Sequence, residues 1–238
     1  MSIIKVNNLS FSYPNKETVL HDISFTINHG ECIALLGKTG SGKSTLFENL
    51  IGLKVPQTGT VIVNELALVP RNLKHIQRQI GYCFQDPNDQ LFMPTILEDI
   101  IFGPLNQGIS KEVATAKALE LLTEFDLLDC ADRSVHELSG GQKRLVALAS
   151  ILSMNPSILF LDEPTNGLDP FWRRKLANIL SKLTTHTILI ASHDFPWLAR
   201  VTRRSILLSH GKIVIDRDTK ILLQDSNTLE AHGLPIDW

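Results

Sequence analysis

The segment 37–45, which reads GKTGSGKST, has the residue types and spacing of a phosphate-binding loop. Its glycines allow the backbone to curl until successive N–H groups point at phosphate oxygens. We expect Lys43 to reach the β- and γ-phosphates of a nucleotide, the Ser44 hydroxyl to bind Mg²⁺, and Thr45 to support the α-phosphate. The whole loop is therefore assigned to nucleotide binding: Gly37, Lys38, Thr39, Gly40, Ser41, Gly42, Lys43, Ser44 and Thr45.

The segment 158–165, which reads ILFLDEPT, places two acidic residues directly after four apolar ones. This pattern predicts a buried strand from whose end Asp162 emerges, where its carboxylate could hold Mg²⁺ through water. Glu163 would then lie close to a water in line with the γ-phosphate and could accept a proton from it. Two adjacent acids also occur in solvated turns, but the buried strand and the phosphate-binding loop together favour the catalytic interpretation.

His193 follows another apolar run, Thr187–Ala191, and a serine. At the end of a strand that neighbours the acidic one, its side chain could contact the γ-phosphate and orient Glu163 and the attacking water. A single histidine is more often structural or solvent-facing. The assignment of His193 to the site therefore depends on the complete set of residues.

The elements that must position these residues alternate between strands and helices, which favours an α/β fold. The run 31–37, ECIALLG, lacks polar alternation and suits a strand covered on both faces, as in a parallel sheet. We interpret residues 1–238 as one domain with a helical subdomain at about 86–155 and a turn at 13–16. Further strands are expected at 3–9, 24–27, 60–63, 80–84, 158–161 and 187–191, and helices at 43–51, 111–125 and 145–152.

Composition restricts the possible partners. The chain has 238 residues with 23 Lys and Arg against 25 Asp and Glu, a net charge of −2. This near-balance argues against a nucleic-acid partner, because such proteins usually carry a basic excess. The apolar runs are shorter than the roughly 20 residues of a membrane-spanning helix, and the N-terminus does not resemble a signal peptide. The three cysteines form no CxxC pair. We therefore expect a soluble, intracellular protein that meets a membrane only through a partner.

The segment 138–142 reads LSGGQ and completes an ordered set with the loop at 37–45, Gln85, the acidic strand end, the segment 166–169 and His193. On this set, the chain resembles the ATP-binding cassette (ABC) ATPases over essentially its whole length. The resemblance implies a P-loop NTPase (RecA-like) core with an antiparallel β subdomain and a helical subdomain. It also implies ATP and Mg²⁺ as cofactors and hydrolysis of ATP. The catalytic residues that it implies are Lys43, Gln85, Glu163 and His193.

In the ABC ATPases, LSGGQ begins a helix whose N-terminal amides face the γ-phosphate of the ATP held by the other subunit. The residue types agree, since Ser139, Gly140 and Gly141 offer a hydroxyl and open N–H groups at a helix N-terminus. The resemblance assigns Gln142 to the same site. It implies a head-to-tail dimer with a second ABC ATPase, which would be either another copy of this chain or a paralogue.

Three other positions take their roles from the resemblance. Tyr13 would stack on adenine, Gln85 would reach Mg²⁺ and sense the partner, and Asp169 would couple the two sites of the dimer. A tyrosine before a proline, as here, is otherwise more often a turn or packing residue. The chain departs from the family after LSGGQ, because Leu145 stands where an arginine is frequent and Arg144 precedes it. The metal ligands that the resemblance implies are Ser44, Gln85 and Asp162.

The segment 84–92, FQDPNDQLF, resembles the corresponding segment of energy-coupling-factor ATPases and related cobalt and nickel importers. In that subgroup, Gln90 would begin a short helix beside the groove that receives a transmembrane coupling subunit, with Leu91, Phe92 and Met93 as its floor. The resemblance implies a translocase subunit, peripheral on the cytoplasmic face of the cell (inner) membrane, that works with a substrate-capture subunit. ATP hydrolysis would drive uptake of a micronutrient: a cobalt or nickel ion, or a vitamin such as biotin.

Two alternatives stay open from the sequence. One is the ATPase of another type of ABC transporter, such as an exporter or an amino-acid importer. The other is a non-transport ABC ATPase with a regulatory or DNA-associated role. Between residues 45 and 138 there are no sustained heptads like those of repair-type members, and the chain carries a single set of motifs. Both features favour transport.

Overall fold

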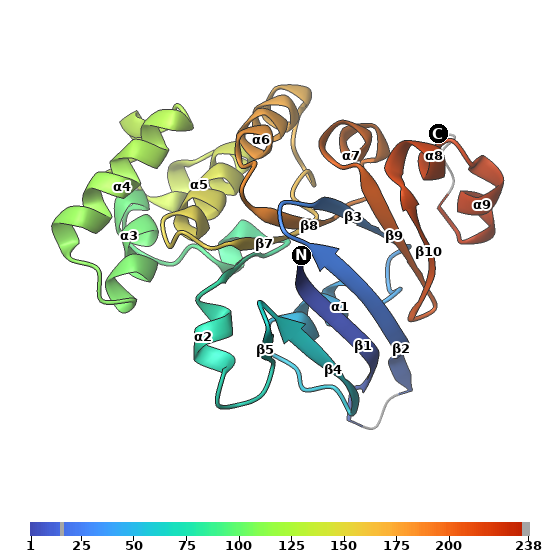
Figure 1. Cartoon of the computed structure of the whole chain (residues 1–238). Helices are drawn as coiled ribbons and strands as arrows, with labels where there is room; N and C mark the ends of the chain where they lie inside the picture. The colour runs from blue at the N-terminus through green and yellow to red at the C-terminus, as the bar shows by residue number, and fades with distance from the viewer. Residues whose placement is uncertain (15–16, 235–238) are drawn as a thin grey trace.

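A six-stranded sheet forms the centre of the computed structural model, which describes residues 1–14 and 17–234 (Figure 1). The strand order is β10-β9-β3-β8-β7-β6, and neighbouring strands are parallel except β10 and β9. The strands are β3 (Cys32–Leu36), β6 (Ile80–Cys83), β7 (Ile158–Asp162), β8 (Thr187–Ala191), β9 (Arg204–Ser209) and β10 (Lys212–Asp218).

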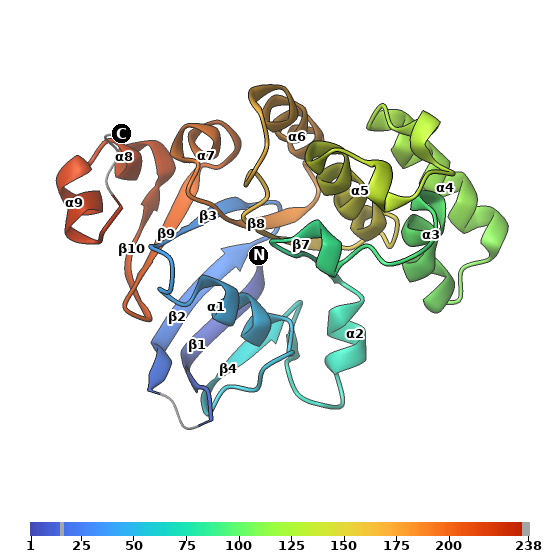
Figure 2. The same ribbon diagram turned by 180° about the vertical axis from the view of Figure 1, so that it is seen from behind.

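A second, antiparallel sheet has the strand order β2-β1-β4-β5. Helix α1 (Lys43–Leu50) lies between the two sheets (Figure 2). Its side chains Leu46, Phe47 and Leu50 pack with apolar residues of both sheets, so the helix that follows the phosphate-binding loop is fixed on two sides. The strands of the second sheet are β1 (Ser2–Ser12), β2 (Thr18–Asn28), β4 (Thr58–Val63) and β5 (Leu66–Ala67).

Helices α3 (Ile96–Asn106), α4 (Lys111–Glu124) and α5 (Gly140–Leu152) pack together at one end of the six-stranded sheet (Figures 1 and 2). They fall within the range 86–155 that we expected to be helical. None of the helices formed by the described residues is long and apolar enough to cross a membrane. The remaining helices are α2 (Leu73–Gln77), α6 (Pro170–Lys182), α7 (Phe195–Val201), α8 (Thr219–Leu223), α9 (Ser226–Ala231) and the short 3₁₀ helices η1 (Pro87–Asp89), η2 (Leu128–Cys130) and η3 (Val135–Glu137).

Several elements are longer than the sequence pattern predicted. Strands β1 and β2 extend beyond the ranges 3–9 and 24–27 on both sides. The helix expected at 145–152 begins at Gly140, because the Ser139 hydroxyl accepts a hydrogen bond from the Gln142 amide while the Gln142 side chain accepts one from the Ser139 amide. Of the turn expected at 13–16, residues 15 and 16 lie outside the described residues.

The six-stranded sheet has a hydrophobic core on each face. In β3, Ile33 and Leu35 point towards α1 and the antiparallel sheet, whereas Ala34 and Leu36 point towards the core that includes α3, α5 and α6. All five residues of β7 and of β8 are buried. This is why these strands read as unbroken apolar runs, as expected for a parallel sheet with both faces covered.

The three cysteines, Cys32, Cys83 and Cys130, are free thiols. Cys83 and Cys130 are buried, and Cys32 is half-buried at the start of β3. Burial raises the pKa of Cys32 to about 12 and that of Cys83 to about 11. Because thiolates are the reactive form, the side chains of Cys32 and Cys83 are unreactive at neutral pH.

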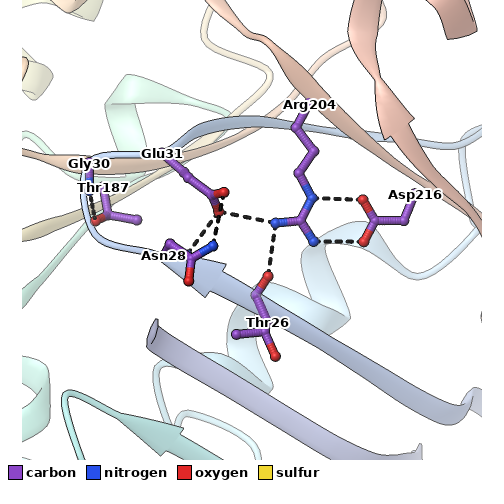
Figure 3. A network of polar contacts seen from close by, with 7 residues as sticks. All are labelled: Thr26, Asn28, Gly30, Glu31, Thr187, Arg204 and Asp216. Carbon is purple, nitrogen blue, oxygen red and sulfur yellow. Dashed lines mark hydrogen bonds and ion pairs between the residues drawn. The ribbon is translucent and has the colours of Figure 1, made fainter. Parts of the chain in front are cut away.

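The side chain of Arg204 joins the two sheets (Figure 3). Its guanidinium forms a two-pronged ion pair with Asp216 of β10, with N···O distances of 2.7 and 2.6 Å. Its third nitrogen donates to the carbonyl oxygen of Thr26 in β2 at 2.9 Å and to the Glu31 carboxylate at 3.0 Å. Since 27% of the Arg204 side chain is exposed, these charge-assisted bonds are partly shielded from water.

We predict that Arg204→Met lowers the free energy of unfolding by about 2 kcal/mol, because it leaves Asp216 and Glu31 without their shared cation. Urea denaturation at pH 7 measures the change. Arg203→Met, at the adjacent exposed position, is the matched control and should change the free energy of unfolding by less than about 0.5 kcal/mol. Equal losses in the two variants would contradict the assignment of Arg204 as the joint between the sheets.

Candidate functional site

A cavity of about 710 Å³ opens where β3, β7 and β8 end. This carboxyl edge is where ligands usually bind in an open α/β sheet. Gly37, Lys38 and Ser41 belong to the same loop but do not line the cavity. The sequence-predicted residues that line it are Thr39, Gly40, Gly42, Lys43, Ser44, Thr45, Gln85, Asp162, Glu163 and His193.

The loop at 37–45 requires glycine at two positions. Gly37 has a φ of +153°, and a Cβ atom there would lie 2.4 Å from both the Leu208 carbonyl oxygen and the Ser41 hydroxyl. Gly42 has a φ of +107° and directly precedes α1. At Gly37, any other residue would clash with the Leu208 carbonyl oxygen and the Ser41 hydroxyl. At both positions, the positive φ disfavours residues other than glycine. The loop therefore has the tight curvature that backbone recognition of phosphate needs.

Lys43 is 8% exposed, and its ammonium lies within the curve of the loop. Nζ donates to the Gly37 carbonyl oxygen at 2.6 Å and lies 3.3 Å from His193 Nε2. Burial lowers the pKa of Lys43, while the nearby Glu163 and Asp162 carboxylates oppose that shift. A cation held in this place faces the cavity in which a phosphate group would sit.

Ser44 and Asp162 form a polar pair at the floor of the cavity. Ser44 Oγ donates to Asp162 Oδ2 at 2.7 Å, and the hydroxyl of Tyr82 donates to the same oxygen at 3.2 Å. Tyr82 was not predicted from the sequence; the signal was its place on the strand beside β7, where it pairs with Phe160.

The donor set fits Mg²⁺ held jointly with a phosphate ligand. In the described part of the chain, no group of three or more His, Cys, Asp or Glu side chains could hold a metal ion. Ser44, Gln85 and Asp162 instead offer a hydroxyl, an amide oxygen and a carboxylate around one cavity. Mg²⁺ prefers such hard oxygen ligands and usually completes its shell with water and substrate phosphates.

Glu163 has an unusual backbone and an unsatisfied side chain. Its φ is +47°, in a region that a non-glycine residue rarely adopts, and its N–H donates to the Ala191 carbonyl oxygen at 2.8 Å. Oε2 accepts from the His193 N–H at 3.2 Å, whereas the buried Oε1 has no hydrogen-bond partner among the described residues. Burial raises the pKa of Glu163 despite the nearby Lys43. Such strain and desolvation are typical of functional positions.

His193 lies between Lys43 and Glu163. Its Nε2 is 3.3 Å from Lys43 Nζ and also 3.3 Å from Glu163 Oε1. Burial and the neighbouring Lys43 lower the pKa of His193, which favours the neutral ring. Nε2 accepts from the ammonium in one tautomer of that ring, and in the other it carries the ring proton and faces Glu163 Oε1. The contact with Glu163 is therefore a close approach and not an ion pair.

Tyr13 lies next to the loop without lining the cavity. Its hydroxyl is 3.2 Å from Thr45 Oγ1 and donates to Glu48 at 3.2 Å. The ring of Phe11 packs edge-on against Tyr13, with ring centres 5.0 Å apart, and Lys54 Nζ lies 5.4 Å from the centre of the Tyr13 ring.

The LSGGQ residues also lie outside the cavity. Ser139 caps α5, which packs with α3 and α4 away from α1 (Figure 2). A Cβ atom at Gly140 would meet nothing within 4 Å, whereas one at Gly141 would collide with Trp172. Asp169 caps α6 by accepting from the Trp172 amide. The structure therefore keeps the two expected anion-binding helix starts, at α1 and α5, apart within one chain.

The loop after Glu163 contributes cavity residues to which sequence reasoning assigned no role in the site. Thr165 is fixed by a 3.1 Å hydrogen bond between its hydroxyl and that of Ser192. Arg173 forms an ion pair with Asp194 at 3.0 Å. Their nearness in sequence to Asp162 and His193 was the available signal. The lining residues to which the sequence analysis gave no site role are Val19, Thr165, Asn166, Gly167, Arg173, Asp194 and Pro196, although Asn166 and Gly167 belong to the segment 166–169 of the motif set.

The structure corrects two expectations for the segment 84–93. Gln90 follows η1 instead of beginning a helix, and its amide donates to the Ala147 carbonyl oxygen at 2.6 Å and to Ser150 Oγ at 2.9 Å. Leu91 is 6% exposed and belongs to the core, so it is no groove floor. The physical reason is that Gln90 fastens the segment onto α5 and turns Leu91 inwards.

A groove of about 550 Å³ does lie beside this segment. Phe92, which is 65% exposed, contributes to it, but Met93 does not. The apolar lining residues of the groove are Phe84, Phe92, Phe102, Ile151 and Met154.

The ABC transporter family matches residues 20–166, a stretch that includes the phosphate-binding loop, Gln85, LSGGQ, Asp162 and Glu163. The chain belongs to the ABC transporter family. This ABC ATPase is 42% identical to a Streptomyces coelicolor protein provisionally named as an ABC transporter ATP-binding protein, over 99% of this chain and 90% of that one. It is 36% identical to the energy-coupling factor transporter ATP-binding protein EcfA of Methanosphaera stadtmanae, over 100% of this chain and 87% of that one.

Solved structures agree with the family. The ABC ATPase matches cbiO1 of Clostridium perfringens, part of the ABC transporter complex cbiONQ, with a TM-score of 0.85 and 30% identity over 99% of this chain and 96% of that one. It matches the ATP-binding cassette MJ0796, a dimer bound to ADP and Pi, with a TM-score of 0.81 and 30% identity over 91% of this chain and 98% of that one. The expected fold class, a P-loop NTPase of the ABC type, is confirmed.

We predict that Glu163→Gln makes the protein more stable at pH 7, by on the order of 1 kcal/mol, because it replaces a desolvated carboxylate with a neutral amide of the same shape. The raised pKa means that the folded state binds this proton more readily than the unfolded state, so the contribution of Glu163 to stability falls as pH rises above about 4.5. The advantage of the variant should therefore shrink as pH is lowered towards 4.5.

Denaturation midpoints between pH 5 and pH 8 measure this difference. Glu65→Gln is the matched control, because Glu65 also has a positive φ, of +67°, but is exposed and distant from the site. It should show no such pH dependence. A Glu163→Gln protein that is less stable than the unaltered one at pH 7 would contradict the account of Glu163.

Proposed function

We propose that this chain binds and hydrolyses ATP as a subunit of an energy-coupling-factor type importer that drives uptake of a micronutrient. The observation that carries the catalytic part is the meeting of Lys43, the Ser44–Asp162 pair, Glu163 and His193 around one cavity. The importer type is supported by the likeness to EcfA and to cbiO1. The micronutrient would be a cobalt or nickel ion or a vitamin such as biotin.

Binding would use the loop at 37–45 for the phosphates, with Lys43 as the main positive charge and Thr45 beside the α-phosphate. Tyr13, close to Thr45, would stack on adenine. Ser44, Asp162 and Gln85 would hold Mg²⁺, which when bound supplies charge neutralisation at the β- and γ-phosphates. The protein's own contribution is to fix these groups before the nucleotide arrives.

Hydrolysis would begin with Glu163 accepting a proton from a water in line with the γ-phosphate. The water oxygen forms a bond to the γ-phosphorus, the bond to the β,γ-bridging oxygen breaks, and ADP and phosphate result. A raised pKa suits Glu163 to this work, because a general base is most effective when its pKa lies nearer the working pH. His193, 3.3 Å from Glu163 Oε1, would orient Glu163 and contact the γ-phosphate.

A second ABC ATPase would complete the site. Since Ser139, Gly140, Gly141 and Gln142 lie outside the cavity of their own chain, they are available to the nucleotide of a partner subunit. The dimeric state of MJ0796 supports this arrangement. The partner would be a second copy of this chain or a paralogue, arranged head to tail.

The groove beside the segment 84–93 would receive a transmembrane coupling subunit, which would work with a substrate-capture subunit. Its lining combines three phenylalanines with Asp99, which is 6% exposed. Asp99 Oδ1 accepts from the Phe92 and Met93 amides, and Oδ2 has no hydrogen-bond partner within the described residues. A helix with apolar side chains and one donor would fit it. The chain would then be peripheral on the cytoplasmic face of the inner membrane.

We predict that Glu163→Gln lowers ATP turnover by more than about 100-fold and stabilises an ATP-bound dimer, because binding is retained while the base is lost. Phosphate release measures turnover, and size-exclusion chromatography with Mg²⁺ and ATP measures the dimer. Glu65→Gln should hydrolyse ATP normally. Unchanged hydrolysis by Glu163→Gln would show that Glu163 is not the general base.

We predict that Phe92→Asp and Phe102→Asp prevent association with an integral membrane protein but leave basal ATP turnover within about twofold, since a charge in the groove opposes apolar docking. Purification from detergent-solubilised membranes, with the partner identified by mass spectrometry, tests this. Val113→Asp, at a site 61% exposed on α4 outside the groove, is the control. Stimulation of turnover by DNA ends or ribosomes, with no membrane partner, would instead support a non-transport ABC ATPase.

A further inference from the structure

The segment 84–91, which we call the Gln85 segment, is fastened to helix α5 at several points. Arg144 donates to the carbonyl oxygens of Phe84 and Gln85, and Gln90 donates to Ala147 in the next turn of the helix. A third contact joins Lys143 Nζ to Asn88 Oδ1 at 3.1 Å. The Gln85 segment therefore rests along one side of the helix that begins with LSGGQ.

Arg144 is the central one of these contacts. Its Nη1 lies 2.7 Å from the Gln85 carbonyl oxygen and 3.1 Å from that of Phe84. Its Nη2 lies 3.5 Å from the carbonyl oxygen of Asn166, in the loop that follows Glu163. One guanidinium thus joins the Gln85 segment, α5 and the loop after β7. Both Gln85 and Asn166 line the cavity of the candidate site.

The environment of Arg144 is costly for a cation. Its side chain is 5% exposed, its Nε has no hydrogen-bond partner, and among the described residues no carboxylate forms an ion pair with it. Main-chain carbonyl oxygens hold the charge, with the Cys83 thiol beside it and the Asp86 and Asp162 carboxylates attracting it without forming an ion pair. Only a planar fork can reach these separate carbonyls at once, so neither lysine nor glutamine could replace it fully.

The adjacent Leu145 does not share this role. It is 1% exposed and belongs to the hydrophobic core. The position at which the family often has an arginine is therefore apolar in this chain. Of the two adjacent residues, Arg144 is the one that contacts the Gln85 segment.

We propose that Arg144 is a positioning residue that sets the place of Gln85 at the cavity and makes ATP turnover depend on the Gln85 segment. This inference rests on the proposed function of Gln85 as a ligand of Mg²⁺. Because the carbonyl of residue 85 is held directly, any displacement of the fork displaces the backbone from which the Gln85 side chain projects. The same bond ties α5, and so Ser139 at its start, to the segment beside the groove.

Arg144→Lys is the main test variant, because it keeps the charge and loses the fork. We expect turnover to fall about tenfold and the Mg²⁺ concentration for half-maximal turnover to rise several-fold, while affinity for a fluorescent ATP analogue without Mg²⁺ stays within about twofold. Lys143→Gln, which removes the neighbouring exposed contact, should leave all three quantities nearly unchanged. A merely structural role would not raise the Mg²⁺ requirement selectively.

A double-mutant cycle separates positioning through Gln85 from other effects. In a Gln85→Ala background, Arg144→Lys should cause little further loss of turnover, because the group that it positions is already gone. Amide hydrogen exchange of the peptide spanning 84–91 should become faster in Arg144→Lys and not in Lys143→Gln.

Each outcome has a distinct meaning. Equal losses of turnover with and without Gln85, or unchanged hydrogen exchange in Arg144→Lys, would overturn the positioning role while leaving the proposed function intact. No effect of Gln85→Ala on turnover would instead refute the proposed role of Gln85, and no hydrolysis by the unaltered protein would refute the proposed function. Either result would remove the basis of the inference.

Discussion

Three neighbouring parallel strands, β3, β8 and β7, end at nearly the same position along the sheet, and the site depends on this alignment. Ala191 of β8 stands opposite Leu35 of β3 on one side and Asp162 of β7 on the other. The chain therefore leaves the sheet at nearly the same height three times. The phosphate-binding loop, Glu163 and His193 follow these exits directly, so residues far apart in sequence meet around one cavity.

Burial acts on the three central ionisable groups in opposite senses. It lowers the pKa of Lys43 and of His193 and raises that of Glu163, in each case favouring the uncharged form. Backbone contacts hold these groups together. Glu163 keeps its positive φ while its N–H is bonded to the Ala191 carbonyl oxygen, and the Lys43 ammonium is bonded to the Gly37 carbonyl oxygen of its own loop. A site of this kind is organised for a highly charged ligand at the expense of the stability of the empty fold.

The sequence predicted structure and candidate site correctly where a residue's chemical type and its neighbours in the chain determine its position. The buried strands, the loop at 37–45 and the acid after β7 are of this kind. It failed where contacts join distant segments: Tyr82 reaches Asp162 across a strand pair, and Gln90 turns onto α5. The residue pattern placed the start of α5 five residues late, because a Ser-Gly-Gly sequence is typical of a turn. The resemblance, in which LSGGQ begins a helix, placed it correctly, and the reciprocal bonds of Ser139 and Gln142 show why. LSGGQ was expected to serve another subunit, and its position away from the cavity agrees with that expectation without testing it.

The state of the native cysteines has a practical consequence for spectroscopy. Cys32 and Cys83 stay protonated far above neutral pH, and Cys130 is only 5% exposed. A maleimide dye offered at pH 7 should therefore ignore all three and attach to a single cysteine introduced at an open surface position. Two differently labelled preparations could then show by energy transfer whether copies of the chain associate, in protein that otherwise keeps its natural sequence.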